Sequence, residues 1–318
     1  MVLSGGWRVF VGALVLSAGV VAPATASADP AACTTWNQVE LPVPPAVKFG
    51  HVTAASGSFA VGNGSFWSMY GSTILIWKDG QEFDQLAVFR GGPIWAHDVN
   101  SSGVVLVTSP SSASRWQQAG GYEPLRGLSG EYQVKAVDLN ERGDVLGLSA
   151  GLPVLWPAGS STPQRVPGLD ESWTVRGLAD DGSVLASNSS GTYWIGASGA
   201  VPLGATAEVR AVRGAHAVGT LDAGTEDAKA VRWNTSGEIT ATYPYFVTPA
   251  AVNTRGHVLS QDSWGMSVWF DAESGREVLN SSGANYAALT DDDDIYTSWG
   301  GGSDRGTPLL LDCANGTR

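Results

Sequence analysis

Histidine, aspartate and arginine side chains at the start of repeated segments are the chain's best candidates for acid–base chemistry. His51 and His97 stand at the start of two successive segments, and Asp98 follows His97 directly. General acid–base catalysis needs such groups within hydrogen-bond reach of one another. If the protein is an enzyme, we predict that these three residues act with Arg176 and Arg210. The competing interpretation is that the histidines are hydrogen-bonded structural residues.

No recognisable motif supports metal binding or nucleophilic catalysis. The histidines show no H-x-x-x-H spacing and no Cys/His cluster, and a G-x-S-x-G setting is missing. Asp291–Asp294 is a run of four carboxylates that could attract a cation, but it occupies the place of a turn in other repeats. We therefore predict a solvated turn there, and surface positions for His216 and His257. We predict no metal and no cofactor.

The chain has thirteen tryptophans, and six of them recur at one place of a repeat. These six, followed by a leucine in the seventh place, are spaced 36 to 42 residues apart: Trp77, Trp116, Trp156, Trp194, Trp233, Trp269 and Leu311. A period near 40 residues, with short apolar runs separated by turn glycines, is typical of β-propeller blades.

The repeat is clearest between Lys135 and Leu169, where it reads as four strands. We predict these strands at Ala136–Asn140, Asp144–Ser149, Leu152–Trp156 and Gln164–Leu169. The fold prediction is an all-β, single seven-bladed propeller with four-stranded blades. A β-sandwich with coincidental spacing is the alternative.

The last repeat lacks a fourth strand, and the N-terminal segment Trp36–Pro42 resembles the missing one. We predict that it joins the last blade and closes the ring, which removes the open sheet edges. The two cysteines, Cys33 and Cys313, then fall at the seam, and we predict a disulfide between them. Free or intermolecular thiols are the alternative.

Five tryptophans have no place in the repeat. Trp67, Trp264 and Trp299 fall between second and third strands, and Trp95 and Trp173 just before first strands. In a propeller both kinds of connection emerge on one face, where aromatic rings can serve as binding anchors. We predict that a ligand contacts Trp67, Trp95, Trp264, Trp299 and Tyr70. For Trp95 and Trp173, packing at the channel mouth remains an alternative. The opposite face is predicted to be plain.

The N-terminus has the organisation of a secretory signal peptide. Arg8 precedes an apolar run at 9–21, and Ala26-Ser27-Ala28 follows. We predict a signal peptide at 1–28, a propeller at 29–318, and a secreted protein with no membrane contact after cleavage. Losing Arg8 changes the net charge from −12 to −13, with 17 Lys and Arg against 30 Asp and Glu. Such acidity disfavours nucleic acid as a partner. We expect a monomer.

The repeated pattern also resembles a known family. Asp138-Leu139-Asn140-x-x-Gly143-x-Val145-x-Gly147 is followed by Leu155-Trp156, and N-x-x-G recurs at Asn100 and Asn253. This pattern resembles the bacterial extracellular HAF-repeat proteins. The His-Ala-Phe tripeptide of that family is replaced here, for example by Leu152-Pro153-Val154. The resemblance implies a secreted propeller-like scaffold with no defined activity.

Three functions are compatible with the sequence. The first is a binding protein whose aromatic loop face takes an extracellular glycan or protein. The second is an extracellular lyase or hydrolase that acts on a polymer at the channel mouth. The third is a structural surface scaffold without catalysis.

Overall fold

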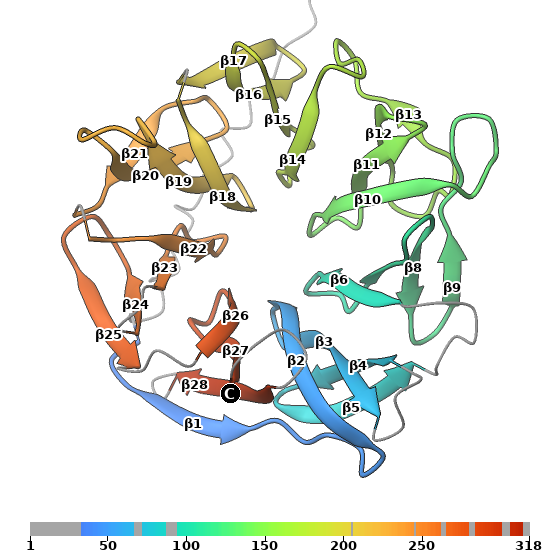
Figure 1. Cartoon of the computed structure of the whole chain (residues 1–318), viewed down its shortest axis with the longest axis vertical. Helices are drawn as coiled ribbons and strands as arrows, with labels where there is room; N and C mark the ends of the chain where they lie inside the picture. The colour runs from blue at the N-terminus through green and yellow to red at the C-terminus, as the bar shows by residue number, and fades with distance from the viewer. Residues whose placement is uncertain are drawn as a thin grey trace, which may run out of the picture. The chain divides into compact units, whose positions relative to one another are not determined.

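The computed structural model of the chain describes residues 33–66, 72–86, 94–204, 206–244, 246–261, 265–279, 284–300 and 306–313. These residues belong to one compact unit, Ala32–Arg318. Strands make up its regular structure, and they form seven four-stranded antiparallel sheets arranged in a ring, as Figure 1 shows. The predicted seven-bladed β-propeller is confirmed. In the described part of the chain, no helix has the length and apolar character that crossing a membrane requires.

Blades 1 to 4 follow the chain order, with the first strand of each innermost and the fourth outermost (Figure 1). Blade 1 is β2 (Val47–Ser56), β3 (Phe59–Phe66), β4 (Ser72–Lys78) and β5 (Gln81–Leu86). Blade 2 is β6 (Trp95–Val99), β7 (Val105–Thr108), β8 (Ala113–Gln117) and β9 (Gly121–Pro124). Blade 3 is β10 (Val134–Leu139), β11 (Val145–Ser149), β12 (Leu152–Trp156) and β13 (Gln164–Arg165). Blade 4 is β14 (Thr174–Leu178), β15 (Val184–Asn188), β16 (Gly191–Gly196) and β17 (Gly199–Gly204).

Blades 5 and 6 repeat this order, and blade 7 combines both ends of the chain. Blade 5 is β18 (Glu208–Arg213), β19 (His216–Leu221), β20 (Lys229–Asn234) and β21 (Ile239–Thr242). Blade 6 is β22 (Pro249–Val252), β23 (Val258–Gln261), β24 (Met266–Trp269) and β25 (Gly275–Leu279). Blade 7 is β26 (Ala284–Leu289), β27 (Ile295–Trp299), β28 (Thr307–Cys313) and, from the N-terminus, β1 (Trp36–Glu40).

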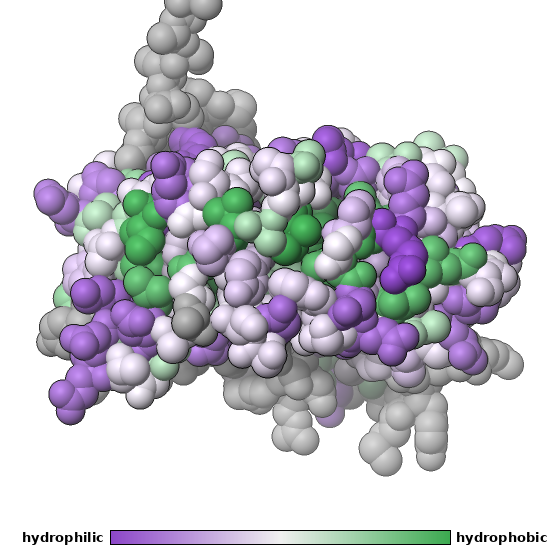
Figure 2. All heavy atoms as spheres, turned by 90° about the horizontal axis from the view of Figure 1, so that it is seen from above, coloured by the Kyte–Doolittle hydropathy of each residue, from purple (hydrophilic) through white to green (hydrophobic). Residues whose placement is uncertain are grey.

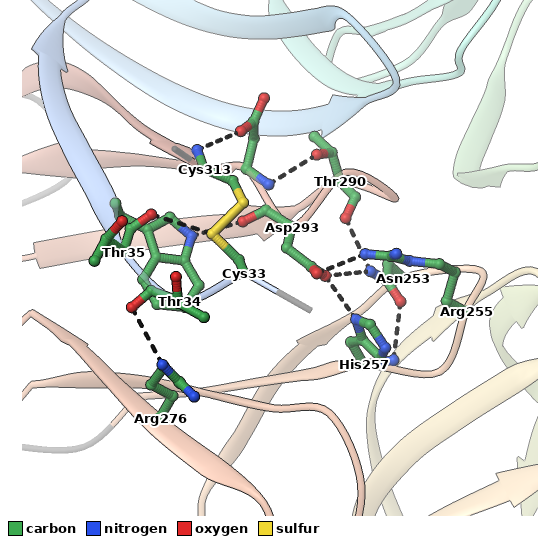
Figure 3. Close-up of a disulfide and its surroundings, with 12 residues drawn as sticks. Cys33, Thr34, Thr35, Asn253, Arg255, His257, Arg276, Thr290, Asp293 and Cys313 are labelled. Carbon is green, nitrogen blue, oxygen red and sulfur yellow. Dashed lines mark hydrogen bonds and ion pairs between the residues drawn. A yellow bond between two sulfur atoms is a disulfide. The ribbon is translucent and has the colours of Figure 1, made fainter. Parts of the chain in front are cut away.

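Ring closure depends on β1, which pairs antiparallel with β28 from Trp36 opposite Cys313 to Glu40 opposite Leu309. The predicted closing strand is therefore confirmed. The disulfide between Cys33 and Cys313 is also present, with Cα atoms 5.8 Å apart (Figure 3). It lies where other blades have the turn between their third and fourth strands. The bond thus supplies the covalent link that blade 7 lacks.

The repeated tryptophans lie in third strands as predicted, and their rings fill the space between neighbouring blades. Trp156, for example, is fully buried with Leu106 and Leu125 of the preceding blade and Val145 of its own. Burying a ring of this size is a main source of stability, because about 25 cal/mol is gained per Å² of apolar surface removed from water. Seen from the rim, apolar residues show at mid-height between hydrophilic ones (Figure 2).

Four predicted strand boundaries in blade 3 were wrong. The first strand covers Val134–Leu139 instead of Ala136–Asn140, because the turn begins at Asn140. The fourth strand covers only Gln164–Arg165 instead of Gln164–Leu169. Pro167 has no N–H for the ladder, and Gly168 has a φ of 77°, so the chain turns there. The second strand begins at Val145, because Asp144 belongs to the preceding turn.

Each inner strand contains an irregularity at the same place. The pairing of the first with the second strand shifts in all seven blades, and in six of them one residue is skipped: Thr53, His97, Val137, Arg176, Arg210 and Ala250. Such bulges increase the local twist and redirect side chains. They determine which inner-strand residues are exposed near the axis.

Candidate functional site

The two ends of the ring differ in their connections. We call the turn face the end that carries the turns between first and second and between third and fourth strands. The connection face carries the links between second and third strands and between successive blades. All inner strands run from the connection face to the turn face, because every blade has the same strand order. Inner-strand residues early in sequence therefore lie near the connection face.

Basic side chains gather near the connection face of four consecutive blades. His97, Lys135, Arg176 and Arg210 come from the inner strands of blades 2 to 5, and all four are exposed. Three of them occupy the bulge position described above, and Lys135 lies two residues before that of its blade. We call this set the basic arc. Its positive charge contrasts with the net charge of −12 of the whole chain.

Exposed aromatic rings lie at the same end of the ring. Trp95 begins β6 and is 41% exposed, Tyr132 precedes β10 and is 49% exposed, and Trp299 ends β27 and is 39% exposed. Of the predicted ligand-binding residues, Trp67, Tyr70 and Trp264 lie outside the described residues. Tyr132 was not singled out from the sequence. Trp173 packs edge-on against Tyr193 with ring centroids 5.6 Å apart, so it serves packing.

Arg176 and Arg210, both named from the sequence as candidate site residues, line one cavity between blades 4 and 5. The cavity measures about 320 Å³, and Ser187, Thr192 and Glu208 also line it. Arg210 pairs with Glu208, Nη2 to Oε1 at 3.0 Å. Arg176 donates from Nε to the Ser187 hydroxyl at 3.5 Å. The structure therefore brings together two of the five residues suggested for an enzyme.

The other three have different surroundings. His97 Nε2 lies 2.9 Å from the carbonyl oxygen of Val137 in the next blade. His51 is half-buried on β2, paired in register with Asn63 of β3. Asp98 follows the bulge, so it lies nearer the turn face, where its oxygens accept backbone hydrogen bonds from Val99 and Leu139.

The turn-face end of the axis is occupied by an ion pair that the sequence did not predict. Arg213 ends β18 of blade 5, and its Nη2 lies 2.7 Å from Oε1 of Glu141, in the first turn of blade 3. The same guanidinium donates to the Val99 carbonyl at 3.0 Å and lies 3.7 Å from Asp98. Glu141 also accepts hydrogen bonds from the Ser56 hydroxyl and the Ser101 amide. Four blades thus meet at this pair.

Two aspartates beside this pair have perturbed pKa values. Asp98 and Asp138 hold corresponding places in β6 and β10, and each accepts from the inner strand of the next blade, Leu139 or Leu178. Burial raises the pKa of Asp98, and the charge of Arg213 offsets this only in part. Burial and then the charge of Asp98 raise the pKa of Asp138 well above its ordinary value. Two close carboxyl groups resist double ionisation.

The pKa of Glu141 is shifted in the opposite direction. Burial opposes ionisation, but Arg213 and the hydrogen bonds from Ser56 and Ser101 outweigh it, so the pKa of Glu141 lies below its usual value. Glu141 is therefore the ionised partner of Arg213. This end of the axis contains charges that satisfy one another.

Asparagines of the N-x-x-G turns connect neighbouring blades. Asn140 Oδ1 accepts the Asp144 amide within its own turn, while Nδ2 donates to the Ala179 carbonyl of blade 4 at 3.2 Å. Asn253 donates in the same way to the Thr290 carbonyl of blade 7 at 2.9 Å. The turns of this face therefore carry a repeated bond between blades, which was not predicted from the sequence.

Acidic residues of these turns contribute a second set of bonds. The Glu141 amide donates to Asp180 at 3.0 Å, and the Thr254 amide donates to Asp291 at 2.8 Å, each across a blade boundary. The Ser101 amide donates to Glu141 at 2.8 Å in the same way. A carboxylate in one turn thus accepts an amide of the preceding blade's turn.

The predicted solvated turn at Asp291–Asp294 was wrong for its last two residues. Asp293 is 1% exposed and Asp294 is 6% exposed. Asp293 pairs with Arg255 at 2.5 Å and with His257 at 2.7 Å (Figure 3). Asp294 accepts the Cys313 amide at 2.8 Å. His257 is thus part of this network and not a plain surface residue. The network fixes the turn beside the disulfide.

A metal site was not predicted. Across the described ranges of the chain, no group of three or more His, Cys, Asp or Glu residues could hold a metal ion.

The fold resembles solved propellers of very different sequence. A streptogramin B lyase structure matches with 11% identity and a TM-score of 0.55, over 87% of this chain and 97% of that chain. An oligogalacturonate lyase in complex with manganese matches with 10% identity and a TM-score of 0.58, over 88% and 98%. A chain of the mitotic checkpoint complex matches with 14% identity and a TM-score of 0.56, over 95% and 99%. No protein-family model and no curated protein matches the chain. At such low identities these likenesses concern the fold alone.

Proposed function

We propose that this protein is a secreted binding protein that takes an extracellular glycan on its connection face. The single observation that carries the proposal is the exposure of Trp95, Tyr132 and Trp299 at that end of the ring. Aromatic rings offer flat apolar surfaces to sugar faces, and exposed large rings on a globular protein commonly mark an interaction site.

The two faces differ in a way that supports this assignment. On the turn face, Glu141, Asp180, Asp291 and Asp293 are engaged with neighbouring blades. On the connection face, the basic arc is exposed beside the aromatic rings. A positively charged patch on an acidic protein also attracts and orients anionic ligands.

Extracellular residence is part of the proposal. The disulfide between Cys33 and Cys313 requires an oxidising environment to persist. The segment 1–28, with its proposed cleavage after Ala28, lies outside the described residues. Sequencing the N-terminus of exported protein tests this: Asp29 is expected as the first residue, and Met1 would contradict export by signal cleavage.

An enzyme at the channel mouth has less support. The oxygens of Asp98 accept two backbone amides and face Arg213, so this carboxyl is committed to the turn-face end of the axis. His97 is bonded to a backbone carbonyl. General acid–base catalysis needs groups that can reach a substrate together.

The test is to probe the purified exported protein against immobilised extracellular glycans and proteins, with the Trp95→Ala variant in parallel. We expect at least one glycan to bind the native protein and not to bind the Trp95→Ala variant. Binding that is restricted to proteins, or glycan binding that is unchanged in the variant, would overturn the proposal.

A further inference from the structure

The cavity between blades 4 and 5 has the composition of an anion site. It opens among connection-face residues: Arg176 on β14, Ser187 and Thr192 at the adjoining ends of β15 and β16, and Glu208 and Arg210 at the start of β18. Its volume of about 320 Å³ lies at the lower end of the range for small-molecule sites, roughly 300–1,000 Å³. A group as large as one sugar unit suits such a volume.

Arg176 supplies the free cation of this cavity. Among the described residues, Arg176 has one bond, from Nε to Ser187 Oγ at 3.5 Å, and it forms no ion pair. Five other described arginines do have a carboxylate partner, among them Arg142 with Asp144 at 2.6 Å, Arg213 with Glu141, and Arg255 with Asp293. In a chain with 30 acidic residues, an exposed guanidinium without a carboxylate partner is available for a ligand.

The second arginine of the cavity, Arg210, has a carboxylate partner. Its ion pair with Glu208 leaves both side chains about half exposed, at 52% and 53%. An exposed pair of this kind contributes little to stability, but it offsets the charge of Arg210. With Glu208 neutralising one arginine, the cavity has a net charge of +1.

We propose that this cavity binds the carboxylate of an acidic sugar residue, within the glycan that the connection face takes. The inference rests on the proposed function. A guanidinium presents two parallel N–H groups that match the two oxygens of a carboxylate, which makes Arg176 the primary contact. The net charge of +1 balances one carboxylate but not a phosphate dianion.

The hydroxyl groups of the cavity fit the remainder of such a sugar. Thr192 Oγ1 donates to the Ala207 carbonyl at 2.9 Å, which leaves its lone pairs to accept from a sugar hydroxyl. The Ser187 hydroxyl accepts from Arg176, which leaves its proton to donate. The cavity thus has one donor and one acceptor beside the two guanidinium groups.

The test is to titrate the purified protein with glucuronate and with glucose by calorimetry or ligand-observed NMR. We expect glucuronate to bind and glucose not to bind measurably. Arg176→Gln is expected to weaken glucuronate binding by about 10- to 100-fold, the effect of losing a charged hydrogen-bond partner. Arg176→Lys keeps the positive charge but lacks the two parallel N–H groups of a guanidinium, so it should lose most of the same affinity.

Arg165→Gln is the matched control, because Arg165 is an exposed arginine on the outer strand β13 away from this cavity. It should bind like the native protein. Equal affinity for glucuronate and glucose, or native affinity in Arg176→Gln, would overturn the carboxylate site. If the carboxylate site fails but glycan binding is still lost in Trp95→Ala, the proposed function stands without this site. If Arg176→Gln loses glucuronate binding while Trp95→Ala binds every glycan normally, glycan binding by the aromatic rings is refuted and the carboxylate site in the cavity stands.

Discussion

Arg213 Nη2 lies 2.7 Å from Glu141 Oε1, and this contact joins blade 5 to blade 3 across the turn-face end of the ring axis. Both side chains are largely buried, at 14% and 18% exposure. β18, which carries Arg213, and β6, which carries Asp98, lie on opposite sides of the ring centre in Figure 1. The Arg213 guanidinium therefore connects blade 5 with blades 2 and 3, which are not its neighbours in the ring.

Removing the cation should destabilise the ring. Arg213→Met leaves Glu141 and Asp98 buried without a positive partner, so we expect the free energy of unfolding to fall by about 3–5 kcal/mol. Adding Glu141→Gln to this variant should recover part of the loss, because it removes the stranded charge. Chemical unfolding measures both. Native stability in Arg213→Met would contradict the role of the pair.

The neighbouring Asp138 predicts a pH dependence. Its folded pKa is raised, so its contribution to stability is complete below the unfolded value of about 4 and is lost as the pH rises through the folded value. Asp138→Asn keeps an oxygen for the Leu178 amide but cannot ionise. The stability of the variant relative to the native protein should therefore increase from about pH 4 to pH 7. Urea unfolding at the two pH values tests this, and a difference that falls toward pH 7 would refute it.

Because Asn140 bonds to the next blade, we expect its removal to destabilise the protein more than the removal of an asparagine that bonds only within its turn. Asn140→Ala removes a donor from the buried Ala179 carbonyl and the acceptor of the buried Asp144 amide, so we expect a loss of about 2–3 kcal/mol. Asn234 has the same spacing to Gly237, but within the part of the chain that the structure describes its side chain bonds only to Glu238, in its own exposed turn. Asn234→Ala should cost less than about 1 kcal/mol. Equal losses in thermal or chemical unfolding would show that Asn140 acts only within its turn.

The disulfide should act as a single unit. Cys33 and Cys313 are 280 residues apart, and chain entropy then gives an upper figure on the order of 5 kcal/mol for their bond. We expect Cys33→Ser and Cys313→Ser to lower the melting temperature equally, and the double variant to melt at the same temperature as the single variants. A reducing agent should bring the native protein to the same value. Additive losses would mean that the cysteines act separately.

The sequence predicts the fold well because its signals are local and repeated. A tryptophan in six of the seven third strands, with a leucine in the last, and glycines in the turns recur about every 40 residues, which predicts both the strand order and the blade count. The closing strand follows from a missing strand at one end and an extra one at the other.

The site could be predicted only in part, because its contacts depend on residues distant in sequence. Arg213 has no counterpart in the other repeats, and its partners Asp98 and Glu141 come from blades that are not sequence neighbours. Asp293 belongs to a run of residue types that are ordinarily solvated, and only the ring brings Arg255 and His257 to it. One available signal was the recurrence of an acidic residue at one turn place, in Glu141, Asp180 and Asp291.

The most direct test of glycan binding on the connection face compares aromatic substitutions at the two ends of the ring. Trp95→Ala and Trp299→Ala remove exposed rings from the connection face, and Tyr122→Ala removes one near a turn on the opposite face. With a glycan identified on the array, calorimetry should show that each tryptophan variant binds at least tenfold more weakly than the native protein, a loss of about 1.4 kcal/mol or more. Tyr122→Ala should bind normally, and all three variants should melt at the native temperature. Native affinity in both tryptophan variants, or an equal loss in Tyr122→Ala, would contradict binding at this face.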